Sequence, residues 1–131
     1  MVCVSGEKTG PAYEAFRILY LGFIILPLLV GLDKIFNISG SWRGYLAPAL
    51  FSPSPLTEYS VLIIAGAIEI ITGITVAIKP RIGACILMLW LLLVVINLAM
   101  IGISVFSAIL CNFVLAMAAV ALARLSVHFC R

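Results

Sequence analysis

Long apolar runs separated by short polar breaks are the dominant pattern of the chain. The runs cover about residues 13–36, 59–78, 81–102 and 104–125. Each has about the 20 residues that an α-helix needs to cross ~30 Å of hydrocarbon. Helices are the expected form, because backbone groups in lipid must be paired within their own segment. The pattern therefore predicts an all-α fold, an integral membrane four-helix bundle in which residues 1–131 form a single membrane domain.

The breaks between the runs differ in length. Lys79-Pro80-Arg81 separates the second run from the third, whereas only Gly102 and Ser104 mark the end of the third. The apolar stretch on both sides of Gly102 is about twice as long as one crossing, so a tight helical hairpin is expected there. The one sizeable loop spans about residues 37–58, between the first two helices.

Aromatic residues in this loop suggest where it lies. Trp42 and Tyr45 are residue types that gather at the level of the lipid headgroups. The favoured interpretation is an interfacial loop anchored by these two side chains. The alternative is a lid over a substrate site.

Composition agrees with a membrane protein. Hydrophobic residues make up 65% of the 131 residues, and charged residues only 10%. A soluble domain is about half apolar and about a quarter charged, and a chain this short has no room to hide so much apolar surface in a core. The lipid bilayer is therefore the expected partner. No basic run or aromatic-basic module points to nucleic acid.

The basic residues predict an orientation. In a four-helix topology both termini and the turn at residues 79–81 share one side. That side carries Lys8, Arg17, Lys79, Arg81, Arg124 and Arg131. The other side has only Lys34 and Arg43. Positive-inside bias then places both termini on the cytoplasmic, or matrix-equivalent, side of a plasma or inner membrane.

Glu69 is the polar residue of greatest interest, because it is the only carboxylate deep inside a run. A charged carboxylate at the bilayer centre costs roughly 2.5–3.5 kcal/mol on insertion scales. Glu69 is therefore expected to be protonated, bonded to a partner or facing a polar cavity.

Small residues predict helix interfaces in the second and fourth runs, because they let helices approach closely. In the second run they surround Glu69, which places its side chain toward protein. The interface candidates are Ala65, Gly66, Gly73, Ala77, Ala108 and Ala116.

The rise of about 1.5 Å per residue along an α-helix predicts which polar side chains of neighbouring helices lie at the same depth in the membrane, and it gives two such layers. Glu69 and Trp90 lie about 15 Å and 14 Å from the turn at residues 79–81, at 1.5 Å per residue. The Trp90 indole is thus expected to reach Glu69, and Asn97 and Asn112 come out level with each other nearer the outside. Both layers have two interpretations, as hydrogen-bonded packing between helices or as a functional site.

Three further features refine this picture. Lys34 ends the first run and is expected to extend to the outer interface rather than contact a ligand. The face that carries Pro27, Gly31 and Lys34 is a candidate lining for a shallow outward opening. His128 is the only histidine and the cysteines form no C-x-x-C pair, so neither a metal site nor a haem site is predicted within the chain.

The second run contains a G-x-x-E-x-x-x-G pattern, formed by Gly66, Glu69 and Gly73. Together with Arg17, Gly31-Leu-Asp-Lys34 and Lys79-Pro-Arg81, this pattern resembles the DoxX-like superfamily of four-helix membrane proteins. The resemblance covers about residues 14–125. Some members resemble small subunits of thiosulfate:quinone oxidoreductase, and others assist the assembly of membrane complexes. The resemblance thus implies a possible quinone ligand and a larger membrane complex as partner.

Two functional hypotheses follow. The first is a small accessory subunit of a larger membrane oxidoreductase or respiratory complex, which contributes helix packing and a quinone-facing surface. The alternative is a stand-alone quinone-linked oxidoreductase component with Glu69 as proton acceptor. The first is favoured because the chain offers no cofactor ligand and little polar chemistry, so catalysis by the chain alone is not expected.

Overall fold

The computed structural model describes residues 9–40, 42–50 and 57–129, and these form a bundle of long helices. The elements are α1 (Pro11–Phe36), η1 (Trp42–Tyr45), η2 (Pro48–Leu50), α2 (Glu58–Ile78), α3 (Pro80–Ile101), η3 (Ile103–Val105) and α4 (Phe106–Phe129). All four α-helices are long and apolar enough to cross a membrane. The predicted all-α four-helix bundle is confirmed, and the chain is a multi-pass integral membrane protein.

Local sequence signals set the ends of the first two helices. Pro11 occupies the first turn of α1, where its missing N–H costs nothing. Asn37 ends α1 in the left-handed conformation, at φ 51°. The Thr57 hydroxyl accepts a hydrogen bond from the Ser60 amide at 3.2 Å and so caps the start of α2.

The breaks around α3 are short. Lys79 alone separates α2 from α3, and Pro80 opens α3. Gly102 ends α3 at φ 112°, a conformation that side chains of L-residues rarely allow. The turn η3 then occupies three residues, so α4 begins at Phe106 rather than near Ser104, and it continues to Phe129 rather than to Leu125. The expected hairpin is therefore present, displaced by two residues at the start of α4.

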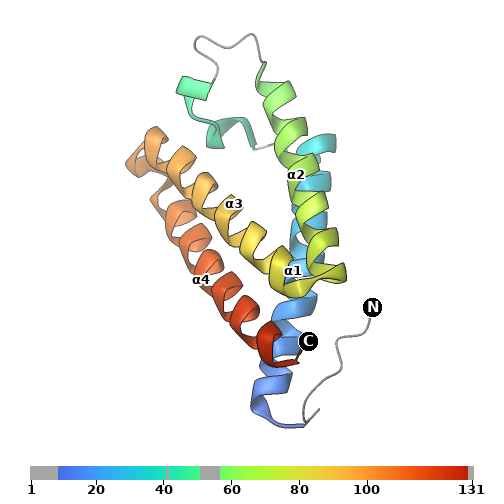
Figure 1. Ribbon diagram of the computed structural model, residues 1–131. Coiled ribbons are helices and arrows are strands. Elements are labelled where there is room, and N and C mark those ends of the chain that lie inside the picture. The colour runs from blue at the N-terminus through green and yellow to red at the C-terminus, as the bar shows by residue number, and fades with distance from the viewer. Residues whose placement is uncertain (1–8, 41, 51–56, 130–131) are drawn as a thin grey trace.

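The helices form two pairs, α1 with α2 and α3 with α4, which meet at one end and diverge at the other (Figure 1). The start of α1 and the end of α4 share the closed end, where the Tyr13 and Phe16 rings each lie 5.5 Å from the Phe129 ring. At the same end the Tyr20 hydroxyl donates to the Ala77 carbonyl at 2.7 Å. Aromatic packing thus holds the pairs together there, while η1 and η2 lie over the open end.

Glycines bring α1 and α2 into backbone contact. A Cβ atom added to Gly66 would lie 2.6 Å from the Gly31 carbonyl oxygen, and one added to Gly31 would lie 2.7 Å from the Gly66 oxygen. A Cβ at Gly73 would lie 3.2 Å from the Ile24 oxygen. The predicted interface residues Gly66 and Gly73 therefore pack on α1, and close approach of these two helices requires residues without a side chain.

The other interface candidates have different surroundings. Ala77 contacts α1 through the bond from Tyr20. Ala116 is buried in the bundle core. Ala65 and Ala108 are half-buried, and both line a cavity between the pairs.

The arrangement predicts which segments share a side of the membrane. Reporter fusions before α1 and after α4 should give the same signal, and a reporter in the loop between α1 and α2 should give the opposite one. Positive-inside bias predicts a cytoplasmic signal at the two ends. Opposite signals at the two ends would contradict the four-helix topology.

The glycine contact predicts a stability difference between two equivalent substitutions. Gly66→Ala should lower the free energy of unfolding in detergent by about 1–3 kcal/mol, because the new methyl group meets backbone rather than a flexible side chain. Gly22→Ala is the matched control, since a Cβ at Gly22 meets nothing within 4 Å. Equal stability of the two variants would exclude the close α1–α2 contact.

Candidate functional site: a buried ion pair beside an apolar cavity

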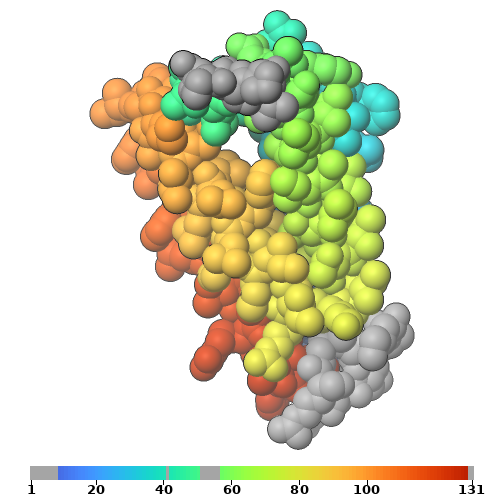
Figure 2. All heavy atoms as spheres, turned by 45° about the horizontal axis from the view of Figure 1, so that its top comes forward, coloured from blue at the N-terminus to red at the C-terminus, as the bar shows by residue number. Residues whose placement is uncertain are grey.

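A cavity of about 770 Å³ lies between the two helix pairs, beneath η1 and η2. All four α-helices and the α1–α2 loop contribute to its walls, which are mostly aliphatic and aromatic. Figure 2 shows the hollow between α2 and α3. The polar side chains that line it include Lys34, Glu69, Asn97 and Asn112. The divergence of the pairs therefore creates an apolar chamber with a few polar groups on its walls.

Lys34 and Glu69 form an ion pair on the wall of this cavity. The Lys34 Nζ atom lies 2.5 Å from Glu69 Oε1, and the two residues are only 8% and 7% exposed. A buried charge is tolerated when an opposite charge meets it, and each residue supplies that charge to the other. Glu69 is thus bonded to a partner, one of the three outcomes that the sequence left open.

The prediction that Lys34 extends to the outer interface is wrong. Phe23, Pro27, Gly31 and Lys34 are all buried and recur at helical spacing along one face of α1. Because Gly31 on this face packs against Gly66, the Lys34 side chain points at α2, where Glu69 stands one turn from Gly66. The helix contact overrides the tendency of a terminal lysine to seek the headgroups.

Trp90 completes the cluster. Its indole nitrogen donates to Glu69 Oε1 at 3.3 Å, so the structure brings Glu69 and Trp90 together as the depth argument predicted. Both donors reach the same oxygen. The second oxygen, Oε2, is buried and has no hydrogen-bond partner among the described residues. Such an unpaired acceptor costs about 1–3 kcal/mol.

The loop covers the ammonium group of Lys34. The Trp42 ring centroid lies 4.7 Å from Lys34 Nζ, a distance typical of a cation–π contact. The Asp33 carboxylate fixes this ring by accepting from the Trp42 indole nitrogen at 2.8 Å, and it also accepts from the Ser39 amide at 2.8 Å. Trp42 therefore packs over the ion pair, and the headgroup-anchor and lid interpretations of the loop both stay predictions.

Asn97 holds the same loop from the other helix pair. Its amide group donates to the Tyr45 carbonyl at 2.6 Å, and its oxygen accepts from the Ala47 amide at 3.0 Å. Asn112 instead donates to the Ala108 carbonyl of its own helix. The described residues show no hydrogen bond between Asn97 and Asn112, which the packing interpretation of this layer implied, because the loop offers Asn97 two backbone groups instead.

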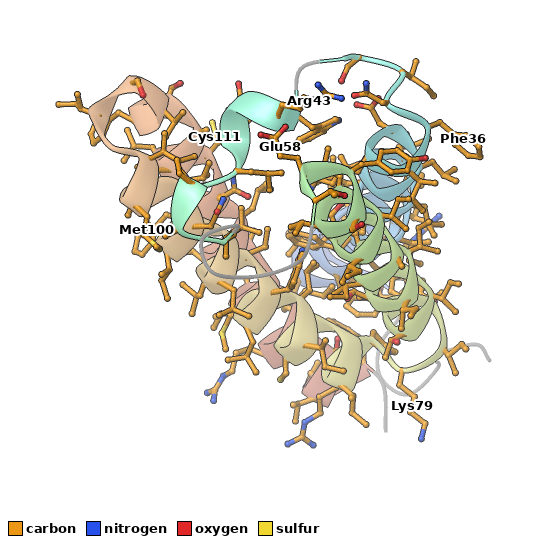
Figure 3. The ribbon with its side chains drawn as sticks, turned by 90° about the horizontal axis from the view of Figure 1, so that it is seen from above. Phe36, Arg43, Glu58, Lys79, Met100 and Cys111 are labelled. Carbon is orange, nitrogen blue, oxygen red and sulfur yellow. The ribbon has the colours of Figure 1, made fainter. Side chains whose placement is uncertain are left out.

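The view along the bundle shows how the loop joins the pairs (Figure 3). Arg43 lies beside Glu58 at the start of α2, while Met100 and Cys111 mark the α3–α4 pair across the opening. The Arg43–Glu58 ion pair is long at 3.8 Å and exposed, so it adds little stability. The hydrogen bonds of Asn97 and Trp42 therefore hold the loop more strongly than the Arg43–Glu58 ion pair does.

Sequence reasoning missed two members of the site, Lys34 as the partner of Glu69 and Asn97 as the clamp of the loop. For Lys34 a signal was present, because it falls three residues after Gly31 and seven after Pro27, on the apolar face that packs inward. For Asn97 no local signal exists, since its partners are backbone groups about 50 residues away.

Comparison of the chain with protein-family models, with curated proteins and with solved structures finds no match.

The ion pair predicts an order of stability among variants. Glu69→Leu should lower the free energy of unfolding by about 3–5 kcal/mol, because it leaves Lys34 buried without an opposite charge. The double variant Lys34→Met/Glu69→Leu should recover most of this loss, since apolar pairs often replace buried ion pairs at little cost. Thermal unfolding in detergent measures both, with Arg43→Gln as the exposed control. A Glu69→Leu variant as stable as the control would exclude a charged pair.

The two hydrogen bonds of Asn97 to the loop predict a local change in hydrogen exchange. Asn97→Leu removes both hydrogen bonds to the loop. The amide hydrogen of Ala47 should then exchange with deuterium at least roughly tenfold faster, because the free energy of local opening falls by about the contribution of one hydrogen bond. The rest of the bundle should keep its protection. Asn112→Leu is the matched control, because among the described residues Asn112 bonds to its own helix and not to the loop. Unchanged exchange at Ala47 in Asn97→Leu would show that other contacts hold the loop.

Proposed function

We propose that this chain is a small accessory subunit of a larger membrane oxidoreductase or respiratory complex and that its cavity forms a quinone-facing surface. The proposal places it in a plasma or inner membrane with both ends on the cytoplasmic or matrix-equivalent side. The likeness of its second helix and basic turn to the DoxX-like pattern supports the accessory role. The buried Lys34–Glu69–Trp90 cluster on the cavity wall is the observation that carries the quinone-facing surface.

The size and lining of the cavity suit such a ligand. Sites for small molecules typically enclose about 300–1,000 Å³, with apolar walls and a few placed polar groups. This cavity, at about 770 Å³, lies within that range and has both features. Its apolar walls would hold a ring and part of an isoprenoid tail, and the polar cluster would orient the ring.

The polar groups match the chemistry of a quinone head. A quinone carbonyl accepts hydrogen bonds, and an ammonium group has three N–H donors, of which one in Lys34 is directed at Glu69. A quinol hydroxyl donates, and the Glu69 carboxylate accepts. The residues of this chain would therefore bind and orient the head group, while the electron transfer would belong to the partner subunits.

A second candidate is a stand-alone quinone-linked component in which Glu69 accepts the proton that a quinol releases. The unpaired Oε2 atom favours this candidate, because a carboxylate oxygen without a donor is available to a proton.

Purification from native membranes in mild detergent tests the accessory role. We expect the tagged chain to copurify with redox subunits of a larger complex and with quinone in the lipid extract. Ala65→Trp should lower the quinone content, because Ala65 lines the cavity, whereas Ala121→Trp on the exposed side of α4 should not. Recovery of the chain alone, without redox subunits, would contradict the accessory role.

Turnover separates the two candidates. The variant Lys34→Met/Glu69→Gln removes the acid and its counter-charge together, so no buried charge is stranded. The accessory role predicts that assembled complex with this variant binds quinone more weakly but keeps most of its turnover at saturating quinone. A fall of roughly 100-fold, the size expected for loss of a proton-transfer group, would instead assign the proton to Glu69.

A further inference from the structure

The two carboxylate oxygens of Glu69 have unequal surroundings. Oε1 receives the Lys34 ammonium and the Trp90 indole N–H, whereas Oε2 receives no donor from the described residues. Both oxygens are in a low-dielectric environment, where a hydrogen bond to a charged acceptor is strong. The Glu69 carboxylate thus has one buried acceptor atom that no described donor uses.

The charge of the site is also defined. Among the described residues that line the cavity, Lys34 is the one amine and Glu69 the one carboxylate, and they form an ion pair with each other. An anionic head group would meet the Glu69 carboxylate, and a cationic one would compete with Lys34 for it. Either would bring an uncompensated charge into an apolar chamber, which is costly. A neutral head group avoids this cost.

We propose that the cavity selects neutral amphiphiles whose head group donates a hydrogen bond to Glu69 Oε2. This inference rests on the proposed function, and within it the hydroxyl-bearing, reduced form of a quinone binds in preference to the oxidised form. Oε2 is enclosed in the ligand-free arrangement. The proposal requires a small rotation about the soft terminal torsion of the carboxylate, which would bring Oε2 toward the cavity that the same side chain lines.

The shape of the cavity fits the tail of such a ligand. Apolar side chains of α2 and α3, such as Ile68 and Val94, form part of its walls. The hollow between these helices lies beneath the loop, between segments that are apolar enough to cross the bilayer (Figure 2). A tail that leaves the cavity between α2 and α3 therefore enters lipid rather than water.

A matched pair of probes tests the selection. One is a para-alkylphenol and the other is its methyl ether, with the same brominated tail, so the two differ only in the donor. Both tryptophans of the chain, Trp42 and Trp90, line the cavity, and bromine quenching of their fluorescence in lipid nanodiscs reports binding. The wild-type protein should bind the phenol at least roughly tenfold more tightly, as expected for one hydrogen bond to a charged acceptor.

Variants assign the preference to Glu69. Lys34→Met/Glu69→Leu should bind phenol and ether with equal affinity, whereas Arg43→Gln should keep the wild-type preference. Within the wild-type protein a meta-fluorinated phenol, the stronger donor, should bind more tightly than the parent phenol. This second measurement applies even where the double variant does not fold.

The outcomes distinguish the inference from the proposed function. Equal binding of phenol and ether by the wild-type protein would overturn the donor selection and leave the cavity as a ligand site. Tighter binding of an alkyl carboxylate than of the phenol would overturn the selection for neutral heads. A preference that persists in Lys34→Met/Glu69→Leu would place the acceptor elsewhere. Binding of neither probe would contradict both the selection and the quinone-facing surface.

Discussion

The neutralisation of one buried charge by another is the constraint on which the rest of this structure depends. Lys34 and Glu69 come from different helices, and each would be costly in an apolar environment without the other. Their contact requires that α1 and α2 lie close together and that each helix is rotated about its axis so that these two side chains face each other. The glycines at positions 31 and 66 permit that closeness through backbone contact. Helix packing and charge pairing are therefore one requirement, met by residues on the same two helix faces.

The cavity follows from an unequal distribution of packing along the bundle. Aromatic rings from α1 and α4 close one end, while at the other end the helix pairs diverge and the α1–α2 loop lies across them (Figure 1). This loop is held from both pairs, by Asp33 through Trp42 and by Asn97 through two backbone bonds. Trp42 also contacts the Lys34 ammonium. The loop that lies over the cavity is therefore linked to the ion pair through the Trp42 side chain.

The fold followed from the sequence more completely than the site did. Apolar run length and the need to pair backbone groups in lipid predicted the helices within a few residues, and Pro80 and Gly102 marked their breaks. Depth along the helices placed Trp90 beside Glu69 correctly. Lys34 was missed as the partner of Glu69 because a lysine near a helix end usually extends to the lipid headgroups. The rotation of α1 about its axis, which directs Lys34 toward α2, was not evident from the sequence. The role of Asn97 depends on an irregular loop, whose backbone positions no helical period predicts.

The central claim is that Lys34 and Glu69 meet as an ion pair inside the bundle. Solid-state NMR of the protein in lipid bilayers, with ¹⁵N in lysine side chains and ¹³C in glutamate carboxyls, measures this contact directly. The account predicts strong dipolar coupling between the Lys34 ammonium nitrogen and the Glu69 carboxyl carbon, with the carbon shift of an ionised carboxylate. Absence of that coupling, with the Lys34 nitrogen in rapid exchange with water at the headgroups, would contradict it.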